Sequence, residues 1–139
     1  MNKILLLICI VLLANSSNSQ GLVKGNLIGI HKITVTLKEN VTMNEFKTFY
    51  LTKVLPAYEK TWVGLKGYLL QSFKDTTGFA IVWLFKSVKA RNRYFTPDGK
   101  SNELEKAAHQ KVQPIEDMLK NKYGSYSIEY KDGDDWIVQ

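Results

Sequence analysis

Cysteine is nearly absent from this chain. The only one, Cys9, lies inside an apolar run near the N-terminus, from Ile4 to Ala14. If that run is removed, the remaining chain has no disulfide, no thiolate ligand for a metal and no cysteine nucleophile. An exported domain of this kind must be held together by the packing of its core.

Long apolar runs are also missing. The run Ile4–Ala14 contains about eleven residues, and as a helix it would cover only about half of a 30 Å hydrocarbon core. A basic start at Lys3 and a polar stretch with small residues flank it, as in a cleavable export signal. We therefore expect a signal peptide over residues 1–19, cut after Ser19 or alternatively after Ser16. The mature protein would then be secreted or periplasmic in a bacterium, with no stable membrane anchor.

Histidine is scarce, with two residues in the chain, and the motifs of several chemistries are missing. Without cysteine, two histidines leave only carboxylates to complete a metal site, and the histidine spacings of zinc enzymes do not occur. No phosphate-binding loop and no Gly-x-Ser-x-Gly elbow is present. The net charge of +6 is spread along the chain, without the aromatic-interleaved basic stripe that binds single-stranded nucleic acid. We expect neither a metal site nor a nucleic acid partner.

The N-terminal half begins with a clear strand and a clear helix. Apolar residues alternate with others over Leu27–Leu37, which predicts a β-strand. Thr42 and Glu45 have the spacing of a capping box. We therefore expect a helix that starts at Met43, runs past Leu55 and is kinked by a proline.

The order of the elements indicates the fold. The remaining predicted elements are a hairpin of strands Tyr68–Phe73 and Phe79–Phe85, a short helix from Ser87 through Phe95, a longer helix capped by Asn102 and a strand Ser125–Lys131. Strand, helix, strand, strand, helix, strand is the split βαβ arrangement. We predict an α+β, ferredoxin-like βαββαβ domain over residues 27–131, with an antiparallel four-stranded sheet and helices on one face. Residues 20–26 are expected to be a flexible mature N-terminus and residues 132–139 a C-terminal tail.

The second face of such a sheet has no helix to cover it. Several strands contribute apolar groups to that face, including the wholly apolar Phe79–Phe85. An uncovered apolar face of this size is prone to aggregate. We therefore expect a homodimer that forms through the sheet face.

Four short segments carry a family resemblance. They are Ile30-His31-Lys32-Ile33-Thr34-Val35, Gly64 to Gly67 before the second strand, Ser87 with the helix that bears Tyr94, and Ala108-His109-Gln110-Lys111-Val112-Gln113-Pro114. Over about residues 27–131 the chain resembles the dimeric α/β-barrel proteins. Within them it is similar to the stress-responsive barrel family, which includes olivetolic acid cyclase, and to the antibiotic-biosynthesis monooxygenase families.

The resemblance implies a site that moves protons without a metal or an organic cofactor. Its residues would be His31, Tyr94 and His109. Imidazoles titrate near neutrality and a phenol polarises a carbonyl oxygen, which suits this chemistry. The strand pattern makes His31 either a pocket base or a satisfied core residue, and the helix pattern puts His109 either at a pocket rim or in solvent.

Two functions remain from the sequence. The first is an exported dimeric barrel that binds a small apolar or aromatic molecule, with cyclase-like or monooxygenase-like acid–base activity left open. The alternative is a non-catalytic envelope protein whose sheet face serves only for assembly.

Overall fold

The computed structural model describes residues 21–75, 77–131 and 135–139. The predicted signal peptide, residues 1–19, lies outside the described residues. Among the described helices, none is long and apolar enough to cross a membrane.

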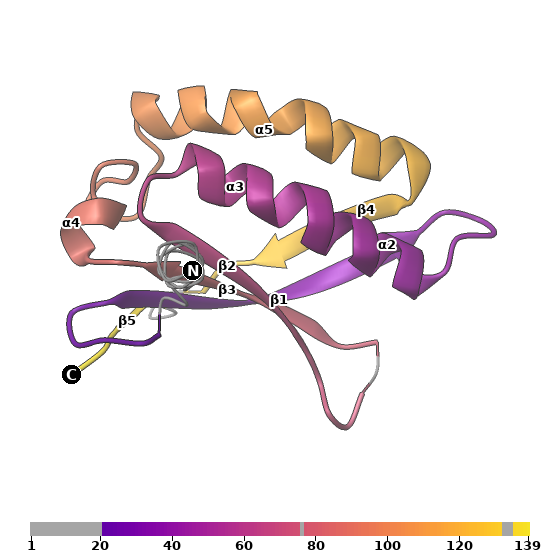
Figure 1. Ribbon diagram of the computed structural model, residues 1–139, viewed down its shortest axis with the longest axis horizontal. Coiled ribbons are helices and arrows are strands. Elements are labelled where there is room, and N and C mark those ends of the chain that lie inside the picture. The colour runs from indigo at the N-terminus through magenta and orange to yellow at the C-terminus, as the bar shows by residue number, and fades with distance from the viewer. Residues whose placement is uncertain (1–20, 76, 132–134) are drawn as a thin grey trace, which may run out of the picture.

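Among the described residues the antiparallel sheet has five strands, of which four lie in the order β2-β3-β1-β4 and the short β5 pairs with β1. The bounds of the four are β1 Leu27–Leu37, β2 Leu65–Gln71, β3 Phe79–Phe85 and β4 Gly124–Glu129, and those of β5 are Asp135–Ile137. The helices lie together on one face of this sheet (Figure 1). This strand order with helices on one face is the ferredoxin-like arrangement, so the predicted fold class is confirmed.

The first helical segment has three parts: α2 Met43–Phe49, the π-helix η1 Tyr50–Val54 and α3 Leu55–Thr61. The predicted capping box is present, because the Thr42 hydroxyl accepts the Glu45 N–H and the Glu45 carboxylate accepts the Thr42 N–H. In the π-helix the Leu55 N–H reaches back to the Tyr50 carbonyl. Pro56 follows directly, and a proline removes one helical donor and crowds the turn before it. The kink expected at the proline therefore takes the form of a widened helical turn, the π-helix Tyr50–Val54.

The second helical segment consists of α4 Val88–Arg91 and α5 Glu103–Lys122. The Ser87 and Asn102 side chains accept backbone N–H groups at the two N-termini, as predicted. The short helix ends at Arg91, earlier than the sequence suggested. The backbone then turns so that the N–H of Tyr94 and that of Phe95 both meet the Arg91 carbonyl.

Two clusters of buried residues fill the space between helices and sheet. One surrounds Ile81, Val54 and Leu119, and the other surrounds Trp62, Tyr94 and Val112. Ile81, Val54 and Val112 are fully buried. Both clusters use the β1 face that carries Leu27 and Ile33, the face predicted from the alternation.

The C-terminal segment contains a strand that the sequence pattern did not indicate. Strand β5, Asp135–Ile137, pairs with Leu27–Gly29 of β1. The neighbouring β4 pairs only with Lys32–Leu37 of β1, so β5 occupies the part of that edge that β4 leaves open. The edge of a sheet presents unpaired backbone N–H and C=O groups. Here β5 pairs with those of Leu27–Gly29.

The segment that leads into β1 ends at a buried residue, Asn26. Asn26 is 1% exposed. Its side chain accepts the Val23 N–H at 2.9 Å and donates to the Lys86 carbonyl at 3.1 Å. The Gly25 N–H donates to the Val138 carbonyl, and the Val138 N–H donates to the Asn26 carbonyl. These two bonds connect the two ends of the described chain.

Gly124 joins α5 to β4 and generates a stability prediction. Its φ of 145° is a conformation that other residues rarely adopt, and an added Cβ would meet the Thr36 carbonyl oxygen and lie 2.8 Å from Leu37 Cα. We expect Gly124→Ala to lower the free energy of unfolding by about 1–3 kcal/mol, measured by urea denaturation. Gly21→Ala is the control, because a Cβ there meets nothing within 4 Å. Equal stability of the two variants would contradict the assigned backbone.

Candidate functional site

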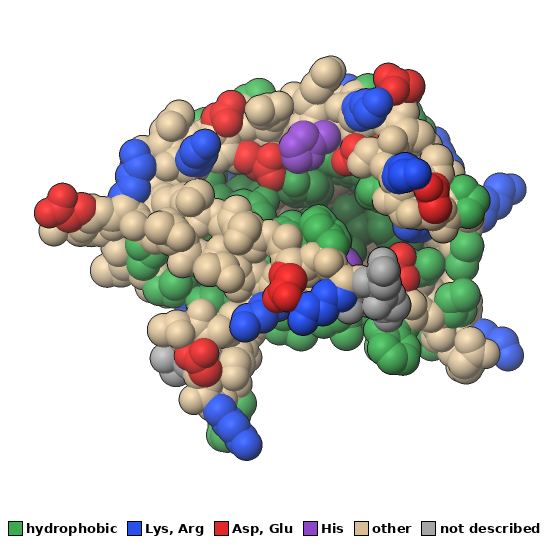
Figure 2. All heavy atoms as spheres, turned by 180° about the vertical axis from the view of Figure 1, so that it is seen from behind, with side chains coloured by type: hydrophobic (Ala, Val, Ile, Leu, Met, Phe, Trp, Pro, Cys, Tyr) green, Lys and Arg blue, Asp and Glu red, His purple; other side chains and the backbone are tan. Residues whose placement is uncertain are grey.

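A large cavity opens between the sheet and α5. Its volume is about 950 Å³, within the range of small-molecule sites. Figure 2 shows it as a hollow with hydrophobic side chains inside and with acidic, basic and histidine side chains around its rim. Its walls include Tyr58, Trp62, Trp83, Glu116, Tyr126 and Tyr130.

A single carboxylate organises the polar part of the cavity. The hydroxyl of Tyr58 donates to Glu116 Oε1 at 2.6 Å, and the hydroxyl of Tyr126 donates to the same oxygen at 2.7 Å. Tyr58 comes from α3, Glu116 from α5 and Tyr126 from β4. Side chains of three elements therefore meet at one oxygen atom. The second carboxylate oxygen, Oε2, receives neither phenol.

The two phenols act as donors to this carboxylate. Burial raises the pKa of Tyr58 and that of Tyr126 well above the ordinary tyrosine value, and the negative charge of Glu116 raises both further. Both side chains therefore stay protonated at neutral pH. They fix the direction of the carboxylate without neutralising its charge.

His109 lies at the rim of the cavity. Its Nε2 is 3.5 Å from Glu116 Oε2, and 44% of its side chain is exposed. Its ring meets Trp62 edge to face, with the centroids 6.5 Å apart. Of the two positions left open by the helix pattern, the rim is the observed one.

His31 lies on the opposite wall, on β1. It is 7% exposed and its ring centroid is 4.6 Å from that of Tyr130. Gly29 precedes it on the same face, and a Cβ at Gly29 would lie 2.7 Å from His31 Nε2. Because Gly29 has no side chain, the imidazole of His31 can occupy this space. His31 is largely buried and also lines the cavity.

Tyr94 has a different position from the two histidines. It is 2% exposed and belongs to the core cluster around Trp62. Its hydroxyl accepts the backbone N–H of Val63 at 2.8 Å. The residues that line the cavity in the described chain do not include it. The structure thus brings His31 and His109 to one cavity and gives Tyr94 a bond that fixes the chain between α3 and β2.

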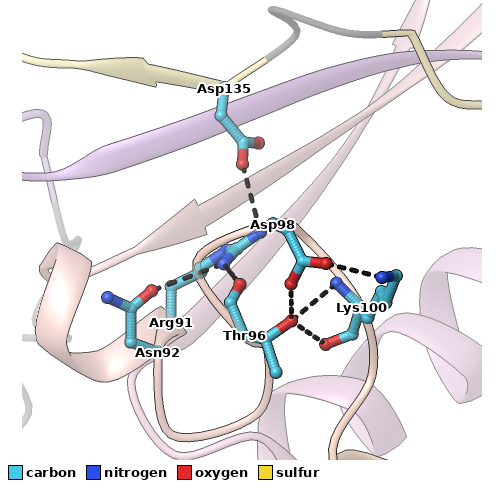
Figure 3. Close-up of polar contacts among 6 residues, drawn as sticks. All are labelled: Arg91, Asn92, Thr96, Asp98, Lys100 and Asp135. Carbon is cyan, nitrogen blue, oxygen red and sulfur yellow. Dashed lines mark hydrogen bonds and ion pairs between the residues drawn. The ribbon is translucent and has the colours of Figure 1, made fainter.

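A polar cluster contributes Arg91, Asp98 and Asp135 to the cavity lining, and Figure 3 shows its contacts. Arg91 Nη1 donates to the Thr96 carbonyl at 2.6 Å, and Nη2 lies 3.6 Å from Asp135 Oδ2. The guanidinium also lies over the Phe95 ring, 5.1 Å from its centroid. Arg91 therefore connects the loop after α4 to β5, and its charge is already matched by Asp135.

Sequence reasoning missed the three residues at the centre of the site. Glu116 carried one usable signal, since it follows His109 by seven residues, two helical turns, and so lies on the same helix face. Tyr58 and Tyr126 carried none, because they belong to distant elements. Among the described residues, no three His, Cys, Asp or Glu side chains are grouped so as to hold a metal ion.

Comparison with known proteins gives structural likenesses of low identity. No family model matches the sequence, and no curated protein matches it. The cofactor-independent oxygenase SnoaB from Streptomyces nogalater is 10% identical, with a TM-score of 0.45 over 83% of this chain and 94% of its own. A substituted variant of that oxygenase is 12% identical, with a TM-score of 0.43 over 77% of this chain and 93% of its own. A dimeric protein of unknown function and ferredoxin-like fold from Bacteroides fragilis is 12% identical, with a TM-score of 0.31 over 81% of this chain and 96% of its own. At these values the fold assignment rests on the strand order of the chain itself.

Two buried tyrosines allow the structural role of Tyr94 to be tested. We expect Tyr94→Phe to lower the free energy of unfolding by about 1–2 kcal/mol, because the Val63 N–H loses its acceptor. Tyr50→Phe is the matched control. The Tyr50 hydroxyl is buried beside the Tyr126 ring and, within the described residues, it accepts no backbone N–H that the change to Phe would leave unpaired. Urea denaturation measures both variants, and a Tyr94→Phe protein as stable as the control would contradict the assignment.

Proposed function

We propose that this chain is an exported barrel that binds a small apolar or aromatic molecule and moves protons on it with its own side chains. One observation carries the proposal. His31 and His109 come from distant parts of the sequence and line the same cavity.

The surroundings of the two imidazoles support acid–base chemistry. Aromatic side chains make up much of the wall between them, and an apolar wall excludes water from a bound ligand. One imidazole is near the floor on β1 and the other at the rim on α5. A ligand held between them has a proton acceptor and a proton donor on different sides. The Glu116 carboxylate lies beside the His109 ring, with its Oε2 3.5 Å from Nε2.

Export is part of the same proposal and is motivated by the first nineteen residues. The mature protein would begin at Gln20 or, with the alternative cleavage site, at Ser17. Mass spectrometry of the protein recovered outside the cytoplasm identifies the first residue, and an intact Met1 would contradict cleavage.

A homodimer through the open sheet face is the proposed assembly. Ile30, Tyr68 and Leu70 project from this face and are each between 43% and 46% exposed. Their strands are paired so that Ile30 and Tyr68 both lie opposite Val82 of β3. A contiguous apolar surface of this kind also supports the second candidate, a non-catalytic protein that uses the face only for assembly.

Deuterium exchange at carbon tests the acid–base proposal. Phenylacetone is an aromatic ketone whose α C–H exchanges slowly in neutral water, and a general base in the cavity would accelerate that exchange. We expect the wild-type protein to catalyse exchange measured by NMR, and His31→Gln or His109→Gln each to slow it by about 10²-fold or more.

Lys111→Gln is the control for these variants, because Lys111 lies on the exposed side of α5. It should exchange phenylacetone at the wild-type rate. Exchange that is undiminished in both histidine variants would refute their assignment, and an inactive wild-type protein would favour the assembly role.

The dimer proposal predicts an effect of charge on the open face. We expect Leu70→Lys to raise the dissociation constant of the dimer by about tenfold or more, since a lysine would be desolvated in the interface. Met118→Lys, on the outer side of α5 and 58% exposed, should leave it unchanged. Sedimentation velocity over a concentration series measures both. A wild-type protein that is monomeric at every concentration would exclude the dimer.

A further inference from the structure

We infer that the ligand of this cavity carries a positive charge, and that an ammonium group on an aromatic or apolar body is held against Glu116. The inference rests on the proposed function, in that it takes the cavity to be a small-molecule site, and it adds the chemical class of the molecule.

The first observation concerns the partners of the Glu116 carboxylate. Only 20% of its side chain is exposed. Its Oε1 accepts both phenols, while His109 Nε2 lies 3.5 Å from Oε2, which is longer than an ordinary N–H···O bond of about 2.7–3.2 Å. Within the described part of the chain, Glu116 has no lysine or arginine partner. Oε2 is therefore available to a ligand.

The cost of such a carboxylate favours a cationic ligand. A charge that is removed from water loses solvation, and an ion partner or strong hydrogen bonds must compensate. The phenols supply two neutral hydrogen bonds and leave the charge in place. Burial, and to a smaller extent the negative charge of Glu116, raises the pKa of both phenols, so the two donors themselves stay neutral.

The second observation is an aromatic wall that leads to this carboxylate. Tyr58 stacks on Trp62 with ring centroids 4.8 Å apart, and Trp83 packs against Tyr58 with centroids 5.0 Å apart. All three rings line the cavity. Tyrosine and tryptophan faces attract cations, most strongly when both groups are desolvated. A wall of this composition ending at a carboxylate is complementary to an organic ammonium ion.

The charges at the other end of the cavity do not oppose this assignment. Three cations, Arg91, Lys120 and Lys131, belong to the lining. Arg91 is matched by Asp135, and Lys131 pairs with Glu129 at 3.1 Å. The lining carries five carboxylates, Asp98, Glu105, Glu116, Asp117 and Asp135, against three cations. Its excess of charge therefore has the opposite sign to the net charge of +6 of the whole chain. An anionic ligand would be attracted to the surface and repelled at the centre of the site.

Three probes with one biphenyl body separate charge from apolar binding. They are 4-biphenylmethylamine, which is a cation at pH 7, 4-biphenylmethanol, which is neutral, and 4-biphenylacetate, which is an anion. Isothermal titration of the full mature protein gives the three dissociation constants. We expect the cation to bind about tenfold or more tightly than the alcohol, and the anion to bind weakest.

The matched variants are Glu116→Gln and Glu103→Gln, the same change at two positions of α5. The amide oxygen that Glu116→Gln introduces would still accept both phenols, so the fold should survive, and circular dichroism checks this. We expect Glu116→Gln to abolish most of the preference for the cation and to leave the affinity for the alcohol within about twofold. Glu103→Gln, on the exposed first turn and paired with Lys106, should keep the wild-type preference.

The outcomes distinguish this inference from the proposed function. If the alcohol or the anion binds wild-type protein as tightly as the cation, or if the preference survives in Glu116→Gln, the charge assignment is overturned while binding of small molecules stands. If none of the three probes binds, both are overturned. The wild-type comparison decides the matter even if the Glu116→Gln protein does not fold.

Discussion

Strand β1 is the element on which the rest of the structure depends. It pairs with β3 along one edge and with β4 and β5 along the other. Because successive side chains of a strand point to opposite faces, its sequence assigns Leu27, His31 and Ile33 to the helix side and Ile30 to the open side. The same alternation thus positions a cavity residue and exposes the face that is proposed for assembly. A shift of one residue in pairing would exchange the two faces.

The site itself depends on a balance between one charge and several rings. Tyr58 and Tyr126 stay neutral because they are buried, and they can be buried because the Glu116 carboxylate accepts their hydroxyl hydrogens. Glu116 is in turn kept in one orientation by the two donors. Each group stabilises the position of the others, so the cluster holds α3, α5 and β4 in a fixed relation around the cavity.

The fold was readable from the sequence wherever a local pattern was sufficient. The bounds of β1 and β3 follow from apolar patterning, and the caps at Thr42, Ser87 and Asn102 follow from side-chain chemistry. Strand β2 was predicted three residues late, because its pairing with β3 begins at Leu65 opposite Phe85 and its own sequence does not mark that start. Strand β5 has three residues, too few for a periodic signal.

The site was readable only in part, for a related reason. The family resemblance supplied His31 and His109 as candidates. Alternation on β1 placed His31 on the apolar face, and the helix pattern placed His109 off the apolar stripe, at a pocket rim or in solvent, because each pattern is a property of one element. The cluster at Glu116 combines side chains of α3, α5 and β4, which come together only when the chain folds. No sequence pattern within one of these elements predicts it. Tyr94 shows the converse, since a tyrosine at the expected place in the chain uses its hydroxyl to bind the Val63 backbone.

The π-helix Tyr50–Val54 has a consequence for what the cavity contains. A π-turn takes in about one residue more than an α-turn, so the helix faces before and after it are out of phase by about 100°. Tyr50, at its start, turns into the core beside Phe46, whereas Tyr58, beyond it, reaches Glu116. The identity of the donor to Glu116 is therefore set by helical phase, and a homologous chain shorter by one residue here would present a different side chain to the cavity.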